Sequence, residues 1–140
     1  MQLKIKKLRP DAIVPSFAHP GDAGIDLYTP DELTIQPGER VSAPIGLAME
    51  IPDGHVGLLW DKSGLSHKHG LKSFGGVIDA GYRGEFKIGL MNLSNKPYTF
   101  AAGDKIIQML VMPVLRPEVI EADELSDSVR GEGGFGSTGK

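Results

Sequence analysis

An aspartate that follows paired glycines is the first feature of this chain that suggests chemistry. The stretch runs from Gly75 to Glu85 and reads Gly-Gly-Val-Ile-Asp-Ala-Gly-Tyr-Arg-Gly-Glu. Its leading glycines carry no side chain, so backbone N–H and C=O groups can approach a flat ligand. Asp79 places a carboxylate beside them that is ionised at neutral pH. The pattern predicts a tight hairpin with polar groups at its tip.

Tyr82 lies three residues after Asp79, where its ring could pack on a sugar face and exclude an additional hydroxyl. Aspartate and glycine are also the ordinary residues of turns. On this stretch alone, a binding site and a plain turn both remain open interpretations.

A second stretch sets a cation, a hydroxyl and a glycine N–H side by side in Lys62, Ser63 and Gly64. Where such residues begin a helical turn, their free N–H groups point outward and can hold phosphate oxygens. Short matches of this kind also arise by chance. The nearby His67 and His69 have no Cys and no acid at ligand spacing, so solvated histidines are favoured over a metal site.

Two polar residues stand in otherwise apolar strands. Asp26 lies in the strand predicted over 23–28, and Gln108 lies in the nearly continuous apolar run over 106–114. Asp26 either faces solvent or serves a site. A buried amide must be hydrogen-bonded, so Gln108 either bonds a backbone partner or points into a site.

The last eleven residues, 130–140, contain five glycines and cannot pack a core. They nevertheless carry Arg130, Phe135, Ser137 and Thr138, which together provide a phosphate-binding loop and a stacking ring. The Gly-Lys-Ser/Thr order of a Walker motif at a strand-to-helix junction is missing. The segment is therefore predicted to be an arm that orders over a bound nucleotide as a lid.

The rest of the chain predicts the β-framework that must position these groups. Nineteen glycines and ten prolines are spread along 140 residues, which indicates many short strands and an all-β sandwich or barrel in one domain. The period-two run over 41–51 is predicted to turn at 52–54 and pair with 56–60 as a hairpin. The run over 106–114 is predicted to be buried on both faces, inside a sandwich or against another subunit.

Composition excludes several classes of protein. With no Cys, the chain has neither disulfides nor Cys-ligated zinc, which fits a reducing compartment and a cytoplasmic location. A net charge of −3 with mixed signs argues against a general nucleic-acid surface, which needs a basic stripe. No segment approaches the roughly 20 apolar residues of a membrane span. We therefore expect neither nucleic acid nor a membrane as a partner.

Five short blocks, in this order along the chain, resemble the motifs of the trimeric dUTPase family, the dUTP diphosphatases. They are Ala23 to Tyr28, Lys62 to Leu65, Gly76 to Gly84, Gly103 to Gln108, and Arg130 to Gly139. Lys62 stands where the family usually has Arg, and a lysine keeps the charge but loses the bidentate fork. The preceding Asp61 is also atypical, and it is expected to place an acid near the phosphates.

The resemblance implies a jelly-roll-like β-sandwich, also described as a β-clip, that forms a homotrimer. Residues 1–117 would be the catalytic domain, and residues 118–140 a linker and a glycine-rich arm that closes a neighbouring subunit's site. The reaction implied is the hydrolysis of dUTP to dUMP and diphosphate with Mg²⁺ on the triphosphate. It would limit uracil incorporation into DNA and supply dUMP for thymidylate synthesis.

The resemblance also assigns roles to individual residues. Asp79 would orient and deprotonate the attacking water, while Lys62, Ser63 and Arg130 would offset charge on the phosphates. The residues expected to bind the nucleotide are Lys62, Ser63, Gly64, Ser73, Gly76, Val77, Ile78, Asp79, Tyr82, Lys87, Gln108, Arg130, Phe135, Gly136 and Ser137.

Other implied roles concern the metal and the base. Asp26 and Gln108 would act on Mg²⁺ through its bound waters. Backbone groups from Ser73 to Ile78 would read uracil, Tyr82 would exclude a 2′-hydroxyl, and Phe135 would stack on the base.

Two alternatives remain. A dCTP deaminase, or a bifunctional deaminase and dUTPase, has a similar scaffold but needs a Glu to relay protons, and Tyr82 with the five blocks fits the diphosphatase better. A non-catalytic nucleotide-binding regulatory protein would not need Asp79, which is intact.

Overall fold

The computed structural model describes residues 1–134, and nearly all of its regular structure is β. The elements in chain order are β1 (Lys4–Lys7), β2 (Ile25–Tyr28), β3 (Leu33–Ile35), β4 (Arg40–Pro44), β5 (Leu47–Glu50), β6 (His55–Trp60), α1 (Ser63–His69), β7 (Leu71–Phe74), β8 (Val77–Asp79), β9 (Lys87–Asn92), β10 (Tyr98–Phe100) and β11 (Lys105–Pro113). The predicted all-β class is confirmed.

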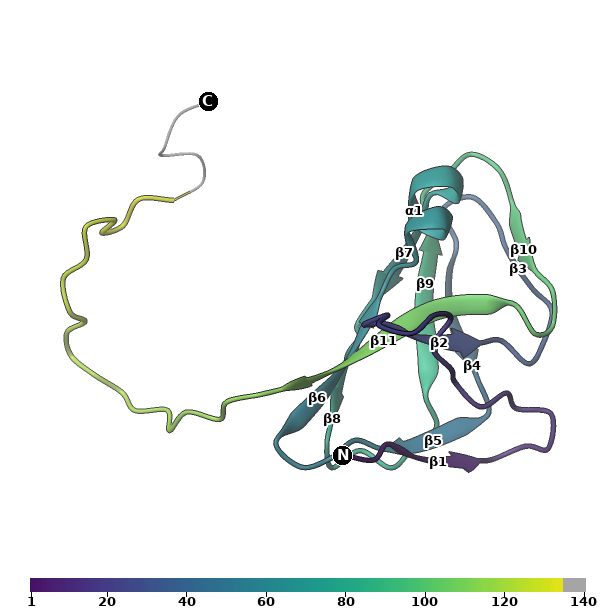
Figure 1. Ribbon diagram of the computed structural model, residues 1–140. Helices are drawn as coiled ribbons and strands as arrows, with labels where there is room; N and C mark the ends of the chain where they lie inside the picture. The colour runs from purple at the N-terminus through teal and green to yellow at the C-terminus, as the bar shows by residue number, and fades with distance from the viewer. Residues whose placement is uncertain (135–140) are drawn as a thin grey trace.

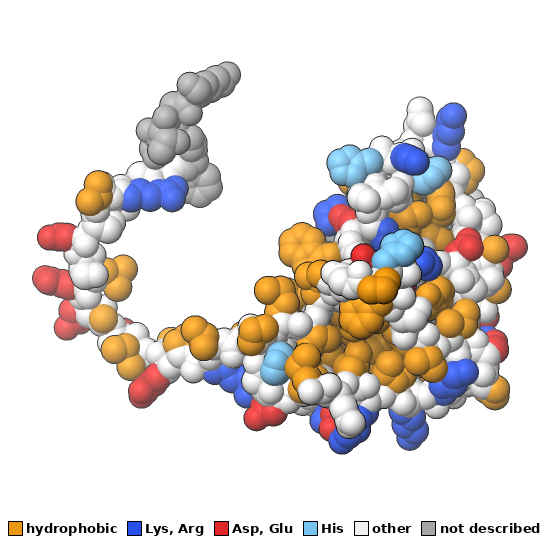
Figure 2. Space-filling view, in the orientation of Figure 1, with side chains coloured by type: hydrophobic (Ala, Val, Ile, Leu, Met, Phe, Trp, Pro, Cys, Tyr) orange, Lys and Arg blue, Asp and Glu red, His pale blue; other side chains and the backbone are white. Residues whose placement is uncertain are grey.

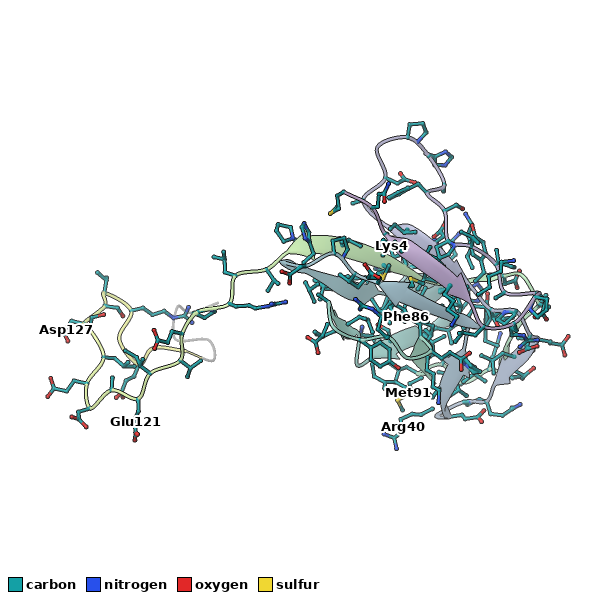
Figure 3. The ribbon with its side chains drawn as sticks, turned by 90° about the horizontal axis from the view of Figure 1, so that it is seen from below. Lys4, Arg40, Phe86, Met91, Glu121 and Asp127 are labelled. Atoms are coloured by element: carbon teal, nitrogen blue, oxygen red, sulfur yellow. The ribbon has the colours of Figure 1, made fainter. Side chains whose placement is uncertain are left out.

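The strands form small antiparallel sheets around one core (Figure 1). The largest sheet has the order β2-β11-β6-β8, a second has the order β4-β9-β7, and β1-β5 and β3-β10 are separate pairs. Apolar side chains from all of these sheets meet in the interior, where Phe86 is 1% exposed; its place within the body is labelled in Figure 3. Other fully buried side chains include Leu27, Ile35, Ile88, Phe100 and Ile107.

The apolar strand β11 is buried only over its first half. Ile106, Ile107 and Met109 are at most 1% exposed, because β11 lies between β2 and β6 and over the core. Met112 and Val114, by contrast, are 44% and 39% exposed. The prediction of burial on both faces therefore holds for the first half alone within a single chain.

The predicted hairpin between 41–51 and 56–60 is wrong. The run breaks at Gly46, whose φ of +68° suits glycine and where a Cβ would lie 2.5 Å from Arg9 Cγ. On one side of the break β4 pairs with β9, and on the other β5 pairs with β1, while β6 pairs with β11 and β8. Alternation shows which face of a strand is buried, but it does not select the partner strand.

The predicted hairpin over 75–85 is also wrong. Strand β8 pairs with β6, and a turn in which Tyr82 N–H donates to Asp79 C=O at 3.0 Å leads the chain across to β9 in the other sheet. Asp79 therefore ends an edge strand at the junction of two sheets instead of sitting at a hairpin tip.

Beyond β11 the chain leaves the body as an extended segment (Figure 1). Leu115, Val119 and Leu125 are each more than 90% exposed, at 93%, 92% and 91%. Figure 3 shows Glu121 and Asp127 far from the strands. Within the described residues, no helix has the length and apolar character needed to cross a membrane.

Candidate active site

Most of the predicted site residues of the body line two separate clefts, whereas Asp26, Ser73 and Gly76 line neither. The β8 cleft has a volume of about 310 Å³ and is lined by Val77, Ile78, Asp79, Tyr82, Glu85, Phe86 and Lys87. The α1 cleft has a volume of about 390 Å³ and is lined by Lys62, Ser63, Gly64, Leu65, Lys68, His69, Lys105 and Gln108. The two clefts have no lining residue in common.

In the β8 cleft, the backbone of β8 presents a free edge. Leu59 N–H donates to Gly76 C=O at 2.8 Å, and the alternation of an antiparallel ladder then directs the N–H and C=O of Val77 away from β6. Gly76 has φ +105°, and a Cβ there would lie 3.1 Å from the Leu59 carbonyl oxygen. The cleft thus has a donor and an acceptor side by side, which can pair with the amide edge of a planar ring.

Tyr82 forms a fixed wall of the same cleft. Its hydroxyl donates to the Glu85 carbonyl at 2.9 Å, and its ring lies 6.0 Å from that of Phe86. A Cβ at Gly84 would lie 2.5 Å from the Tyr82 hydroxyl, so glycine is required beneath the ring. The side chain is nevertheless 43% exposed, which leaves part of the ring for a ligand.

The Asp79 carboxylate is exposed at the end of β8. No other group in residues 1–134 forms a hydrogen bond or an ion pair with this carboxylate. Its oxygens are therefore available to water.

The α1 cleft is built around the start of a short helix. Leu65 and Ser66 N–H both donate to the Lys62 carbonyl, at 2.9 and 3.0 Å. The N–H groups of Ser63 and Gly64 precede these bonds and have no partner within the helix. No side chain or backbone lies within 4 Å of where a Gly64 Cβ would be, so the approach is open.

Asp26 is buried beneath this cleft between two lysines. One carboxylate oxygen accepts a hydrogen bond from Lys62 Nζ, and the other accepts one from Lys105 Nζ at 2.7 Å. Burial raises the pKa of Asp26, but the bonds from Lys105 and Lys62 outweigh it, so the pKa lies below its usual range. The side chain is only 3% exposed, which rules out the solvent-facing interpretation.

Gln108 combines the two roles that the sequence left open. It pairs with Asp26 across β11 and β2, and its Nε2 donates to the Asp61 carbonyl at 2.8 Å. Its Oε1 would lie 2.3 Å from a Cβ at Gly24, so glycine is needed there for this side chain to fit. Gln108 therefore has a backbone partner and also lines the α1 cleft.

The Asp61 carboxylate is held by residues of β7. It accepts hydrogen bonds from the Ser73 N–H at 2.7 Å and from Lys72 Nζ at 2.6 Å. Burial raises the pKa of Asp61, and the bonds from Lys72 and Ser73 more than offset this effect. The Asp61 carboxylate thus joins the end of β6 to β7 and does not line the α1 cleft, and an acid beside the phosphates stays a prediction.

Sequence reasoning missed three polar residues of the α1 cleft. Lys68 follows Gly64 by four residues, so helical spacing brings both to one face. Lys105 begins a strand and reads as a solvated lysine until Asp26 is placed beneath it. His69 lines the cleft with its ring 4.7 Å from that of Tyr98.

Arg130, in the described part of the arm, lies apart from both clefts. Arg130 Nε donates to the Gly133 carbonyl at 2.6 Å, within the segment that leaves the body (Figure 1). Phe135, Gly136 and Ser137 lie outside the described residues.

The two clefts take residues from opposite ends of one sheet face. Strand register places side chains of the β2-β11-β6-β8 sheet in three rows on this face. The rows are Asp26, Gln108 and Trp60; then Leu110, Leu58 and Val77; then Met112, Val56 and Asp79. The first and last rows are about 13 Å apart along the strands. Trp60 and Val77 are 54% and 66% exposed, and Figure 2 shows hydrophobic side chains exposed over the region of β6 and β11.

Comparison with known proteins identifies the family. The family model described as dUTPase matches residues 11–139, almost the whole chain. This chain belongs to the dUTPase family. The resemblance of the five sequence blocks is thereby confirmed.

Curated relatives of this dUTPase-family chain cover it nearly end to end. Deoxyuridine 5'-triphosphate nucleotidohydrolase of Mycolicibacterium gilvum is 47% identical over 98% of this chain and 94% of its own length. The protein of the same name from Clostridioides difficile is also 47% identical, over 98% of this chain and 97% of its own.

Solved dUTPase structures share the fold. The Staphylococcus bacteriophage 80alpha dUTPase with dUPNHPP superposes with a TM-score of 0.93 and 31% identity, covering 99% of both chains. A mutant dUTPase from phage phi11 of S. aureus gives a TM-score of 0.84 and 27% identity, covering 91% of this chain and 100% of its own. That structure is described as showing how a structural Mg(II) ion is coordinated. The jelly-roll-like architecture expected from the sequence is therefore confirmed.

Proposed function

We propose that this protein hydrolyses dUTP to dUMP and diphosphate. The observation that carries the proposal is the exposed, unbonded carboxylate of Asp79 beside the fixed ring of Tyr82 in the β8 cleft. Membership of the dUTPase family and the names of the 47% identical relatives support the same reaction.

Asp79 serves as the general base in this proposal. Its carboxylate holds a water molecule and takes its proton as the water oxygen attacks the α-phosphorus of dUTP. The bond from the α-phosphorus to the oxygen bridging it to the β-phosphorus breaks on the opposite side, and diphosphate leaves. Lys62, with the N–H groups of Ser63 and Gly64 and the guanidinium of Arg130, binds the phosphate oxygens.

Magnesium fits the α1 cleft only through water. Within residues 1–134, no three His, Asp or Glu side chains gather as metal ligands. Mg²⁺ commonly keeps several waters and binds substrate phosphates, whose charge it would offset here. The carboxylate of Asp26 and the amide of Gln108, which pair across β2 and β11, would act on Mg²⁺ through such waters.

Substrate selection is assigned to the β8 cleft. Backbone groups between Ser73 and Ile78, with a contribution from Lys87, would read uracil, and Val77 has the outward N–H and C=O. Groups left unpaired by cytosine, and the lack of room for the thymine methyl, would reject those bases. The Tyr82 ring would exclude a 2′-hydroxyl, and Phe135 would stack on the base.

A complete site requires more than one copy of the chain. The clefts share no residue and take residues from opposite ends of one sheet face, which carries the exposed apolar side chains of Trp60 and Val77. We infer a homotrimer in which this face is buried and one subunit's β8 cleft meets a neighbour's α1 cleft. Residues 1–117 form the catalytic body, and residues 118–140 carry Arg130 and Phe135 to a neighbouring site.

The proposed role is to keep uracil out of DNA and to supply dUMP for thymidylate synthesis. The chain contains no Cys, which fits a cytoplasmic location, where thiols are kept reduced.

Diphosphate release tests the function. The purified protein is incubated with Mg²⁺ and one nucleotide at a time: dUTP, UTP, dCTP or dTTP. We expect rapid release from dUTP alone. Ammonia formed from dCTP would instead identify a deaminase, and binding of dUTP without turnover would identify a regulatory protein.

A further inference from the structure

The three lysines that line the α1 cleft differ in how much of their charge is already offset. Lys62 and Lys105 both donate to the Asp26 carboxylate. An ammonium has three donors, so each can also bond a phosphate oxygen, but Asp26 offsets part of their charge. Lys68 lines the same cleft and has no hydrogen-bond or ion-pair partner in the part of the chain that the structure describes. Its full charge is therefore available to a ligand.

The α1 cleft has an excess of positive charge. Among residues 1–134, no Asp or Glu lines it, and Asp26 beneath it offsets one of the three lysines. Such a cleft suits a ligand with several negative charges. A phosphate group at the end of a chain is the most highly charged kind, with about −1.5 to −2 charges at pH 7. The lysine without a partner is the natural ligand of that group.

Lys68 lies one helical turn from the residues already assigned to phosphate binding. It is exposed on α1, four residues after Gly64, and the two residues share a face of the helix. Four residues span about 6 Å along the helix axis, and helical side chains lean toward the N-terminus, so Lys68 points back over Gly64. The approach over Gly64 is open, because a Cβ there would meet no atom within 4 Å. A phosphate held over Gly64 is thus within reach of the Lys68 ammonium.

The order of groups along the cleft identifies the phosphate. Lys105 and Gln108 lie at the sheet end of the cleft, and Gln108 shares a row of the exposed sheet face with Trp60. Under the proposed function, a neighbour's β8 cleft holds the base and sugar against this face, so the α-phosphate enters the α1 cleft at the sheet end. Figure 1 shows α1 beyond the end of this sheet. The γ-phosphate, which is farthest from the sugar, then lies nearest Lys68.

We propose that Lys68 binds the γ-phosphate of dUTP and thereby makes the site select triphosphates over diphosphates. This inference rests on the proposed function, because it takes the α1 cleft as the phosphate site and the β8 cleft as the nucleoside site. Lys62 and Lys105 act on phosphates that dUTP and dUDP share, whereas Lys68 contacts the group that only dUTP has.

A comparison of two nucleotides tests this role. The affinities of the full-length wild type and of Lys68→Met for dUPNHPP and for dUDP are measured by calorimetry, with EDTA present to suppress turnover. We expect Lys68→Met to weaken binding of dUPNHPP about tenfold, because one charged hydrogen bond is lost. The affinity for dUDP, which lacks the γ-phosphate, should change less than about twofold.

The matched control is Lys96→Met. Lys96 lines a neighbouring hollow of about 300 Å³ together with Lys68, but it does not line the α1 cleft. The control removes the same charge nearby, so both affinities should stay the same. Lys68→Arg retains a cation and should retain the preference for dUPNHPP over dUDP. Thermal unfolding without nucleotide identifies any variant that fails to fold, and Lys68→Gln, also a good helix former, replaces Lys68→Met in that case.

The outcomes separate this inference from the proposed function. If Lys68→Met weakens both nucleotides equally, or neither, the inference is overturned, because Lys68 then does not contact the γ-phosphate. An equal loss in Lys96→Met would overturn it as well, since general attraction would account for the effect. Wild-type protein that neither binds dUPNHPP nor hydrolyses dUTP would overturn the function itself.

Discussion

Three aspartates near the two clefts differ in what holds them. Asp26 is bonded by two lysines, and Asp61 by a lysine and a backbone N–H, whereas Asp79 is exposed and has no bonded partner among residues 1–134. A base must have a lone pair free for the proton that it accepts. Of these three carboxylates, Asp79 alone is exposed and has no bonded cation or N–H group among residues 1–134 to compete with that proton.

Replacing the Asp79 carboxylate should separate binding from turnover. Asp79→Asn keeps the size of the side chain but removes the proton acceptor, so we expect the kcat for dUTP to fall by about 10² to 10⁴. Affinity for dUPNHPP should change little. The control is Asp53→Asn, at a side chain that is 94% exposed. Unchanged turnover in Asp79→Asn would remove this residue from the mechanism.

At the scale of elements, Asp61 joins two strands and the start of α1. Its carboxylate bonds the N–H of Ser73 on β7, and its carbonyl accepts from Gln108 on β11. The residue thus positions Lys62, which follows it, and fixes the Gln108 amide. Its effect on activity is indirect, through the placement of these groups.

The pH dependence of stability should report on Asp61. Its pKa in the folded protein lies below the unfolded value of about 3.9. The stabilisation is therefore complete above that unfolded pKa and is lost as the pH falls through the folded pKa. Asp61→Asn should lower the free energy of unfolding at pH 7 by about 1 to 3 kcal/mol. Urea unfolding from pH 7 to pH 3 should show a shallower loss in the variant, and parallel curves would contradict this role.

Strands could be located from sequence more readily than their partners. The alternating run over 41–51 reports which side chains face the core, and both β4 and β5 obey it although they lie in different sheets. The pairing of β4 and β5 with different strands depended on the break at Gly46. Arg9 packs against this glycine, and no local pattern encodes a contact across 37 positions. The ion pair between Lys105 and Asp26 was missed for the same reason, since it joins residues of two different strands.

At the scale of the whole molecule, we propose separate tasks for the body and the arm. Twenty residues after Val114 extend from the body to the last described residue, 134, and the described part of the arm adds nothing to the core. A chain that ends at Val129 should therefore fold and form trimers. It should hydrolyse dUTP poorly, because Arg130 and the residues after it would be missing. Light scattering and diphosphate release test the two halves of this expectation, and full activity would show that the arm is not a lid.

Mixed trimers test whether the arm serves a neighbour. Chains that end at Val129 have Asp79 but no lid, and full-length Asp79→Asn chains have the lid but no base. If each site takes its base from one subunit and its lid from another, random mixing restores about one quarter of the sites. If the lid closed over its own chain, no site would be restored, because neither chain has both parts. Unfolding and refolding the two variants together, with each refolded alone as the control, distinguishes these arrangements by the dUTP hydrolysis recovered.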